Sequence, residues 1–188
     1  MTNKWLKVAL MATAIATGTS INIDAETVLY VPQDDRPVSL QYTVDTAREA
    51  GMTVLTPPQN LISGKTYQGQ ADQIMAWVEQ NAGRADVMVL STDTLIYGGL
   101  VDSRKHNIPL STLESRLKRI EGLKARHKNV RIYGFGTVMR SPRASGGGTE
   151  PAYYAEYGPT IFQIAALQDK LDSQKLTTDE QKELFMLQ

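Results

Sequence analysis

The chain has no cysteine among its 188 residues. This absence excludes disulfide bridges, thiolate ligands for zinc, a thiol nucleophile and a lipid anchor attached through cysteine. Histidine is almost as scarce, because His106 and His127 are the only two, and both stand in basic surroundings without a clear carboxylate partner. There is also no G-x-S-x-G motif, so a serine hydrolase with a histidine base is not expected.

Charge of one sign is not in excess, because 20 basic side chains balance 20 acidic ones. A protein that binds nucleic acid or anionic lipid through its overall field needs a basic surplus, so neither partner is expected. The basic residues between Arg116 and Arg131 are interrupted by acidic ones at the spacing of a solvated helix face. With 41% hydrophobic residues, the chain can form the core of a soluble domain.

The first 25 residues have the composition of a signal peptide. Lys4 and Lys7 precede an apolar stretch from Val8 to about Gly18, and small and polar residues follow up to Ala25. The stretch is too short for a membrane span, which needs roughly 20 apolar residues. We predict cleavage after Ala25, with a cut nearer Gly18 as the alternative. The mature chain is then secreted or retained in the cell envelope, without stable membrane insertion.

From Ala25 on, apolar runs typical of buried strands alternate with helical patterns. The predicted strands are residues 27–31, 52–55, 87–90 and 130–135, and the predicted helices are residues 40–50, 71–81, 161–171, one that begins near 111 and one that begins near 178. This alternation predicts a single α/β domain over residues 26–188 with a parallel sheet of about four strands. Either the first half of a (β/α)8-type barrel or an open doubly wound sheet fits the pattern.

The helix ends carry recognisable signals. Ser39 is expected to cap the helix over residues 40–50, and Gly51 to end it in a left-handed conformation. Ser111 and Glu114 have the spacing of a capping box, and Thr178 is expected to cap the last helix. Residues 91–104 are predicted to form a long loop.

Polar side chains gather at the carboxyl ends of the predicted strands, where parallel sheets place their ligand sites. The strand ends read Gln33-Asp34-Asp35-Arg36, Pro57-Pro58, Ser91-Thr92-Asp93 and Met139-Arg140-Ser141 in chain order. The opposite ends are turn-like. The sequence therefore predicts a functional site at one edge of the sheet.

The first of these strand ends contains two adjacent carboxylates. Burial of an unpaired carboxylate is costly, so Arg36 is expected to pair with either Asp34 or Asp35. The other could act as a general base, a proton donor, a nucleophile or a metal-ligating oxygen. Its structural alternative is to cap the helix that follows.

The third and fourth strand ends add further candidates. Asp93 is followed by Tyr97, Gly98, Gly99 and Arg104. The tyrosine ring can form a hydrogen bond, the two glycines allow the backbone to approach a ligand closely, and the guanidinium can bind an anion. The alternative is a packed loop in which Arg104 neutralises Asp93.

Arg140 leaves the fourth strand toward the same edge. The chain has no cofactor fingerprint, because Gly134-x-Gly136 lacks its third glycine and Ser63-Gly64-Lys65-Thr66 lacks the first glycine of a P-loop. No metal and no cofactor are therefore predicted.

Three ordered motifs carry a resemblance to a known family. The stretches YVPQDDRPV, VLSTDTLIYGGLVDSR and YGFGTVMR resemble the amino-terminal part of a bacterial family described as domain of unknown function 4127. The resemblance covers roughly residues 28–171 and implies that the motif positions are filled by Asp34, Asp35, Arg36, Asp93, Tyr97, Gly98, Gly99, Arg104 and Arg140. Gln33 and Asp102 stand where the family has apolar residues. Because family members are usually much longer, the resemblance implies a chain that is incomplete relative to them, and it implies no particular reaction.

The residue types at the edge suit a hydroxylated or carboxylated ligand. Our first hypothesis is a hydrolase of glycans or cell-wall carbohydrate, in which Asp34 or Asp35 works with Asp93 as an acid and base pair. The substrate-binding residues would be Arg36, Tyr97, Gly98, Gly99, Arg104 and Arg140. One alternative is a secreted binding protein for a polar or anionic small molecule or glycan, which the arginines favour because arginine transfers protons poorly. Another alternative is a truncated, inactive fragment. The oligomeric state is not indicated.

Overall fold

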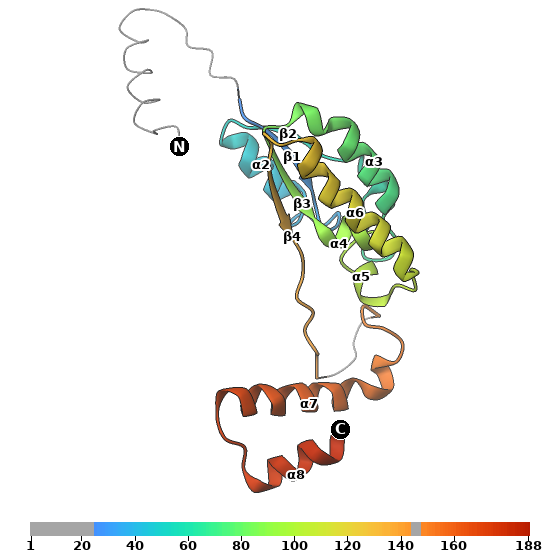
Figure 1. Ribbon diagram of the computed structural model, residues 1–188, viewed down its shortest axis with the longest axis vertical. Helices are drawn as coiled ribbons and strands as arrows, with labels where there is room; N and C mark the ends of the chain where they lie inside the picture. Colours follow the sequence, from blue (N-terminus) through green and yellow to red (C-terminus); the bar gives the residue numbers. More distant parts are fainter. Residues whose placement is uncertain (1–24, 144–147) are drawn as a thin grey trace, which may run out of the picture.

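The computed structural model describes residues 25–143 and 148–188 (Figure 1). Its centre is a four-stranded sheet in which all strands are parallel. The strands are β1 (Thr27–Val31), β2 (Thr53–Leu55), β3 (Val87–Ser91) and β4 (Arg131–Phe135). Each strand lies within one residue of its predicted position at either end. The α/β class and the parallel sheet are confirmed.

The strands have the order β2-β1-β3-β4, so β1 lies in the middle of the sheet. Leu29 of β1 is in register with Leu55 of β2 on one side and with Met88 of β3 on the other. In a barrel of βα units each strand pairs with the next one along the chain, whereas here β1 separates β2 from β3. The order is that of an open doubly wound sheet. In such sheets the strand order reverses between two neighbours, here β1 and β3, and ligands bind beyond their carboxyl ends.

The main core lies between the sheet and two helices, α3 (Ala71–Asn81) and α6 (Leu110–Arg126). Figure 1 shows both helices on the same side of the sheet. Alternate strand residues point toward them, because successive side chains of a strand face opposite sides. The fully buried members of this core include Leu29, Ile74, Met75, Met88, Leu90 and Leu123. A continuous apolar layer therefore holds β1 and β3 in place beneath the predicted site.

Arginines of α6 join this helix to α3. Arg116 donates to Asp72 over 2.6 Å and to the carbonyl oxygen of Ile96 over 2.7 Å, and its side chain is 13% exposed. Arg119 pairs with Glu79 over 2.8 Å. The prediction of a solvated face therefore holds only in part: Arg119 is 31% exposed, but Arg116 is only 13% exposed, and both bind carboxylates about 40 residues away in the chain.

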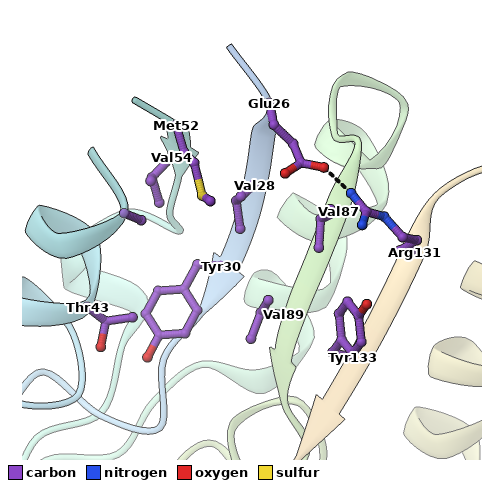
Figure 2. Close-up of a pocket in the computed structure, with 11 residues that line it drawn as sticks. Glu26, Val28, Tyr30, Thr43, Met52, Val54, Val87, Val89, Arg131 and Tyr133 are labelled. Atoms are coloured by element: carbon purple, nitrogen blue, oxygen red, sulfur yellow. Dashed lines mark hydrogen bonds and ion pairs between the residues drawn. The ribbon is translucent and has the colours of Figure 1, made fainter. Parts of the chain in front are cut away.

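The other face of the sheet is covered by α2 (Gln41–Glu49). Val44 of this helix packs with Tyr30 and Val54, and a mostly apolar groove of about 320 Å³ remains beside it. In Figure 2 the side chains of Val89 and Tyr133 line this groove, and an ion pair between Glu26 and Arg131 crosses its amino-terminal end. The groove lies on the face of the sheet and not at the edge where the polar strand ends meet.

The segment after β3 is helical, which corrects the predicted long loop. It contains α4 (Thr92–Tyr97) and α5 (Asp102–Lys105). Ser91 caps α4 by accepting a hydrogen bond from the backbone N–H of Thr94, and Gly98 ends α4 with a φ of 108°. Such short helices have little intrinsic stability and form because tertiary contacts hold them, which explains why no periodicity predicted them.

The caps of two longer helices differ from their predictions. Leu40 stands at the N-cap of α2 without a side-chain hydrogen bond, so Ser39 is not the cap. Instead, the carbonyl oxygen of Ser39 accepts a hydrogen bond from the hydroxyl of Tyr30. Pro109 precedes the first residue of α6, which places Ser111 inside the helix, and no capping box forms there. The left-handed conformation predicted for Gly51 is confirmed by its φ of 81°.

The last two helices, α7 (Tyr154–Ser173) and α8 (Thr178–Leu187), pack on each other through Leu167, Leu176 and Leu184. Figure 1 shows this pair set apart from the sheet. The helix α7 begins seven residues before its predicted start at residue 161, because Gly158 and Pro159 disfavour a helix interior and concealed its first turns. The cap of α8 is Thr177 and not Thr178, in a capping box with Glu180.

Two further short segments, Gln59–Leu61 and Ala82–Arg84, form 3-10 turns before and after α3. Among residues 25–143 and 148–188, none of the helices has the length and apolar content that a membrane crossing requires. The predicted signal peptide lies, up to Asp24, outside the described residues.

Candidate functional site

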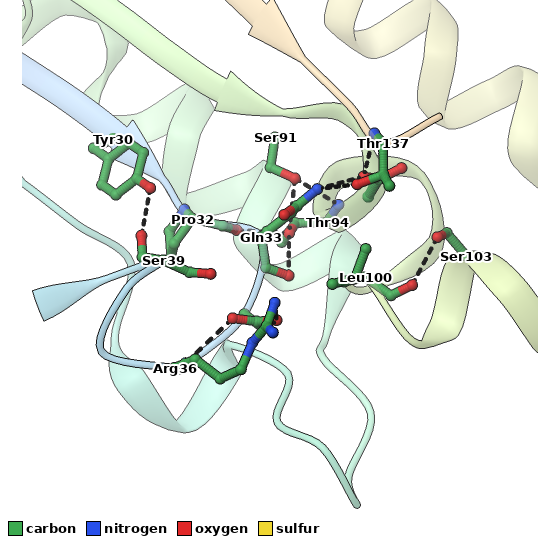
Figure 3. Close-up of polar contacts among 12 residues, drawn as sticks. Tyr30, Pro32, Gln33, Arg36, Ser39, Ser91, Thr94, Leu100, Ser103 and Thr137 are labelled. Atoms are coloured by element: carbon green, nitrogen blue, oxygen red, sulfur yellow. Dashed lines mark hydrogen bonds and ion pairs between the residues drawn. The ribbon is translucent and has the colours of Figure 1, made fainter. Parts of the chain in front are cut away.

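The carboxyl ends of β1, β3 and β4 meet at one edge of the sheet and are cross-linked by side chains (Figure 3). The hydroxyl of Thr94, at the start of α4, donates to the carbonyl oxygen of Pro32 over 2.6 Å. The amide of Gln33 bonds the hydroxyl of Thr137. These contacts fix the segments that follow the three strands relative to each other.

Asp34 is almost fully buried, with 5% of its surface exposed, and its partner is Arg36. Oδ2 of Asp34 accepts from Nε of Arg36 over 2.8 Å and lies 2.7 Å from Nη2, while Oδ1 accepts from the backbone N–H of Arg36 over 3.2 Å. The hydrogen bond to Asp34 raises the pKa of Arg36. The predicted pairing of Arg36 with one of the two carboxylates is confirmed.

Asp35, the neighbouring carboxylate, points to a different partner. It accepts a hydrogen bond from the hydroxyl of Tyr67, which raises the pKa of Tyr67. The backbone N–H of Asp35 donates to the carbonyl oxygen of Ser63 over 2.9 Å. Asp35 therefore joins the end of β1 to the loop at residues 62–70, whose contribution to the edge the sequence analysis missed.

Asp93 lies in the first turn of α4 and is 7% exposed. Its Oδ2 accepts from the side-chain amide of Gln33 over 2.9 Å and from the backbone N–H of Thr137 over 3.0 Å. This carboxylate therefore bridges the segments that follow β1 and β4. Arg104 was considered as its partner, but the neighbours of the carboxylate in the structure are Gln33 and Thr137.

Gly98 and Gly99 make close contacts with the loop at residues 62–70. A Cβ on Gly99 would collide with the hydroxyl of Ser63, and a Cβ on Gly98 would lie 2.8 Å from the carbonyl oxygen of Gly69. The close approach predicted for these glycines is therefore an approach to another part of the chain. Tyr97 packs against His106, with ring centroids 4.7 Å apart and the two rings tilted by 35°.

Two of the predicted arginines share a cavity. Arg36 and Arg104 line a hollow of about 360 Å³ together with Asp34 and Lys65. Most of the lining comes from the segments after β1 and β3, the pair of strands between which the order of the sheet reverses. The loop at residues 62–70 adds Gly64 and Lys65, and the segment after β4 adds Thr149.

Arg104 also lines a smaller hollow of about 160 Å³ with Arg140 and Glu150. Nε of Arg104 lies 3.1 Å from the sulfur of Met139, which turns this side chain toward the segment after β4. Oε2 of Glu150 is buried and has no hydrogen-bond partner within the described residues.

Asp102 is a buried carboxyl group that the sequence analysis did not place in the site. It is 9% exposed, and its Oδ2 accepts a long hydrogen bond of 3.4 Å from the backbone N–H of Gly69. Burial raises the pKa of Asp102, and the Gly69 N–H, Lys105 and Gln68 lower it by less. The available signal was a carboxylate at a position where an apolar residue was expected.

No three histidine, aspartate or glutamate side chains in residues 25–143 and 148–188 are placed to hold one metal ion. The groups that the structure places along the edge include guanidinium, ammonium and carboxyl groups and the Tyr67 hydroxyl.

A family model described as "Protein of unknown function (DUF4127)" matches residues 28–188. The chain belongs to this family. The match begins inside β1 and includes all four strand ends, so the edge described above is part of the family domain. A search of curated proteins and a search of solved structures found no match. The chemistry of the edge itself therefore carries the argument about function.

Proposed function

We propose that the carboxyl edge of the sheet binds a small anionic, hydroxylated ligand, such as a sugar acid, in the cavity between Arg36 and Arg104. The observation that carries this proposal is the lining of that cavity, where Arg36, Lys65 and Arg104 surround a space of about 360 Å³. The carboxylate among its lining residues, Asp34, is already bonded to Arg36. Three cations facing one partly neutralised carboxylate favour a negatively charged guest.

The arrangement of Arg36 supports binding. Asp34 engages Nε and Nη2 of the guanidinium, which orients the fork, while the side chain remains 52% exposed. A guanidinium has five N–H donors, so Arg36 retains donors for a carboxylate after pairing with Asp34. Binding to a guanidinium that is already positioned costs less side-chain entropy than binding to a free one.

Isothermal titration calorimetry on the full chain tests this proposal. Galacturonate is the probe and galactose is its uncharged counterpart. We expect galacturonate to bind and Arg104→Gln to weaken it about 10-fold or more, since a hydrogen bond to a charged group contributes roughly 1.5–3 kcal/mol. Arg48→Gln, which removes the same charge from an exposed position on α2, is the matched control. Equal binding of the two sugars, or equal effects of the two substitutions, would refute the proposal.

Hydrolysis of a glycan is the second function that we propose for this edge, and Asp102 favours it. A general acid has to carry a proton at the working pH, and burial raises the pKa of Asp102 in that direction. Among the three carboxylates that the sequence predicts for the site, Asp35 is the least buried and has Tyr67 as its partner. Turnover of a glycan by the full chain that is abolished by Asp102→Asn, with binding retained, would support this function. Binding without turnover would leave ligand capture as the function.

We also propose export, on the basis of the sequence of residues 1–25. The mass of the protein recovered from the envelope and the medium of an expressing bacterium tests this proposal. A mature chain that starts near residue 26 supports it, whereas an uncut chain in the cytoplasm contradicts it.

A further inference from the structure

A second hollow, of about 380 Å³, lies next to the proposed binding cavity. It is formed by the loop at residues 62–70 and by the start of α5. Lys65 and Val101 line both hollows, as does Gly64, so the two spaces are neighbours along the same edge of the molecule. A ligand longer than one unit can therefore extend from the first hollow into the second.

The side chains of the second hollow combine charge with groups that suit hydroxyls. Lys65 and Lys105 supply two ammonium groups, Gln68 an amide, and Tyr67 an aromatic ring with its hydroxyl. Asp102 contributes a carboxyl group that is 9% exposed. Its partners among the described residues are the N–H of Gly69, over a long 3.4 Å, and the side chain of Gln68. A carboxyl group has acceptor sites beyond these two, so Asp102 can also bond a ligand.

We propose that this hollow is a subsite for the adjoining unit of the ligand, so that the edge of the sheet accommodates an acidic oligosaccharide of two or more uronate units. The inference rests on the proposed binding of a sugar acid in the first hollow. One uronate carboxylate would lie between Arg36 and Arg104, and the next would face Lys65 and Lys105. Asp102 and Gln68 would bond hydroxyls of the second sugar.

The direction in which burial shifts the pKa of Asp102 fits this role. Burial raises its pKa, which favours the neutral carboxyl group. A neutral carboxyl group both donates and accepts hydrogen bonds, as a sugar hydroxyl does, and it does not repel a neighbouring uronate. An ionised carboxylate would repel the neighbouring uronate.

A nucleotide fits the second hollow less well. The sequence around Lys65 ends like a P-loop, but Gln59 stands in place of its first glycine. The helix after this loop begins at Ala71. Lys65 and Thr66 therefore do not stand at the start of a helix, as they would in a phosphate-binding loop. Single strands of nucleic acid are bound on several aromatic platforms, whereas this hollow contains one aromatic side chain, Tyr67.

The test compares galacturonate with digalacturonate by calorimetry on the full chain at constant ionic strength. We expect the wild type to bind digalacturonate about 10-fold more tightly than galacturonate, since the second carboxylate gains a charged partner. Lys105→Gln is expected to reduce this advantage to about 3-fold or less and to leave the affinity for galacturonate unchanged. Asp102→Asn probes the same subsite by a nearly isosteric change, and thermal unfolding checks that both variants fold. Lys182→Gln, on the exposed surface of α8, is the matched control.

Each outcome is decisive. If the wild type binds both sugars equally while Arg104→Gln still weakens galacturonate, the second subsite is refuted and the first proposal survives. If Lys105→Gln and Lys182→Gln keep the same advantage for digalacturonate, the second subsite is likewise refuted. If galacturonate does not bind at all, the proposed function itself fails.

Discussion

The pair formed by Asp34 and Arg36 provides a sharp test of how the edge is built, through the substitution Arg36→Gln. Glutamine keeps the backbone N–H that donates to Oδ1 of Asp34 but removes the two contacts of 2.7 and 2.8 Å to Oδ2. The Asp34 side chain is only 7% exposed, so its carboxylate would remain in place without a charged partner.

The size of the effect follows from the unequal burial of the two side chains. An exposed ion pair contributes about 0–1 kcal/mol, and a fully buried one that loses a partner costs about 3–5 kcal/mol. Arg36 is 52% exposed, which places this pair between the two limits. We expect Arg36→Gln to lower the free energy of unfolding by about 2 kcal/mol, which corresponds to a fall in Tm of about 4–8 °C for a domain of this size.

Urea unfolding followed by circular dichroism measures this difference, with Asp34→Asn and the double variant completing a mutant cycle. Because Asp34→Asn removes the unpaired charge, the double variant should recover about 1 kcal/mol or more of the loss. Arg48→Gln serves as the control for removal of one positive charge. A loss in Arg36→Gln below about 0.5 kcal/mol, or a coupling energy near zero, would show that solvent already screens the pair and would refute the reasoning.

Two further predictions concern the loop at residues 62–70. Gly99→Ala should lower the free energy of unfolding by about 1–3 kcal/mol, because its Cβ would collide with the hydroxyl of Ser63, and Ser63→Gly in the same chain should restore most of the loss in urea unfolding. Absence of that rescue would show that the strain lies elsewhere. Burial raises the pKa of Asp102 in the folded state, so the wild type should lose stability relative to Asp102→Asn as the pH rises above about 4 through the folded pKa. Unfolding curves between pH 3 and 8 test this, and parallel profiles of the two proteins would contradict it.

Much of the local structure was predictable from the residues alone. The run TVLYV is β1, and VMVLS is β3, because apolar and β-branched side chains follow each other without the spacing of a helix. The helix α3 lies at its predicted residues 71–81 because its apolar side chains recur with helical spacing. The polar strand ends were also evident, and parallel strands place such ends on one edge.

The hydrogen-bond partners of the site residues were less predictable from the sequence. That Arg36 would bond a neighbouring carboxylate followed from the cost of burying an unpaired charge, but the choice of Asp34 depended on the turn after β1. Asp93 looked available for catalysis, yet its Oδ2 accepts hydrogen bonds from Gln33 and from the backbone N–H of Thr137, 44 residues further along the chain. Tyr67 was missed because its loop resembles no motif once the P-loop is rejected.

The sequence by itself determined which segments become strands, which become the longer helices and which edge of the sheet carries charge, since these depend on side-chain periodicity and on the direction of the strands. The tertiary structure alone decided the order β2-β1-β3-β4, the helical path of residues 92–105 and the neighbours of each carboxylate. Strand pairing joins residues far apart in the chain, and short helices form only against the surfaces that such pairing creates. For that reason the two adjacent aspartates after β1 and the pairing of one of them with Arg36 could be found in the sequence, whereas the choice of Asp34 for Arg36 and the partner Tyr67 of Asp35 emerged only from the fold.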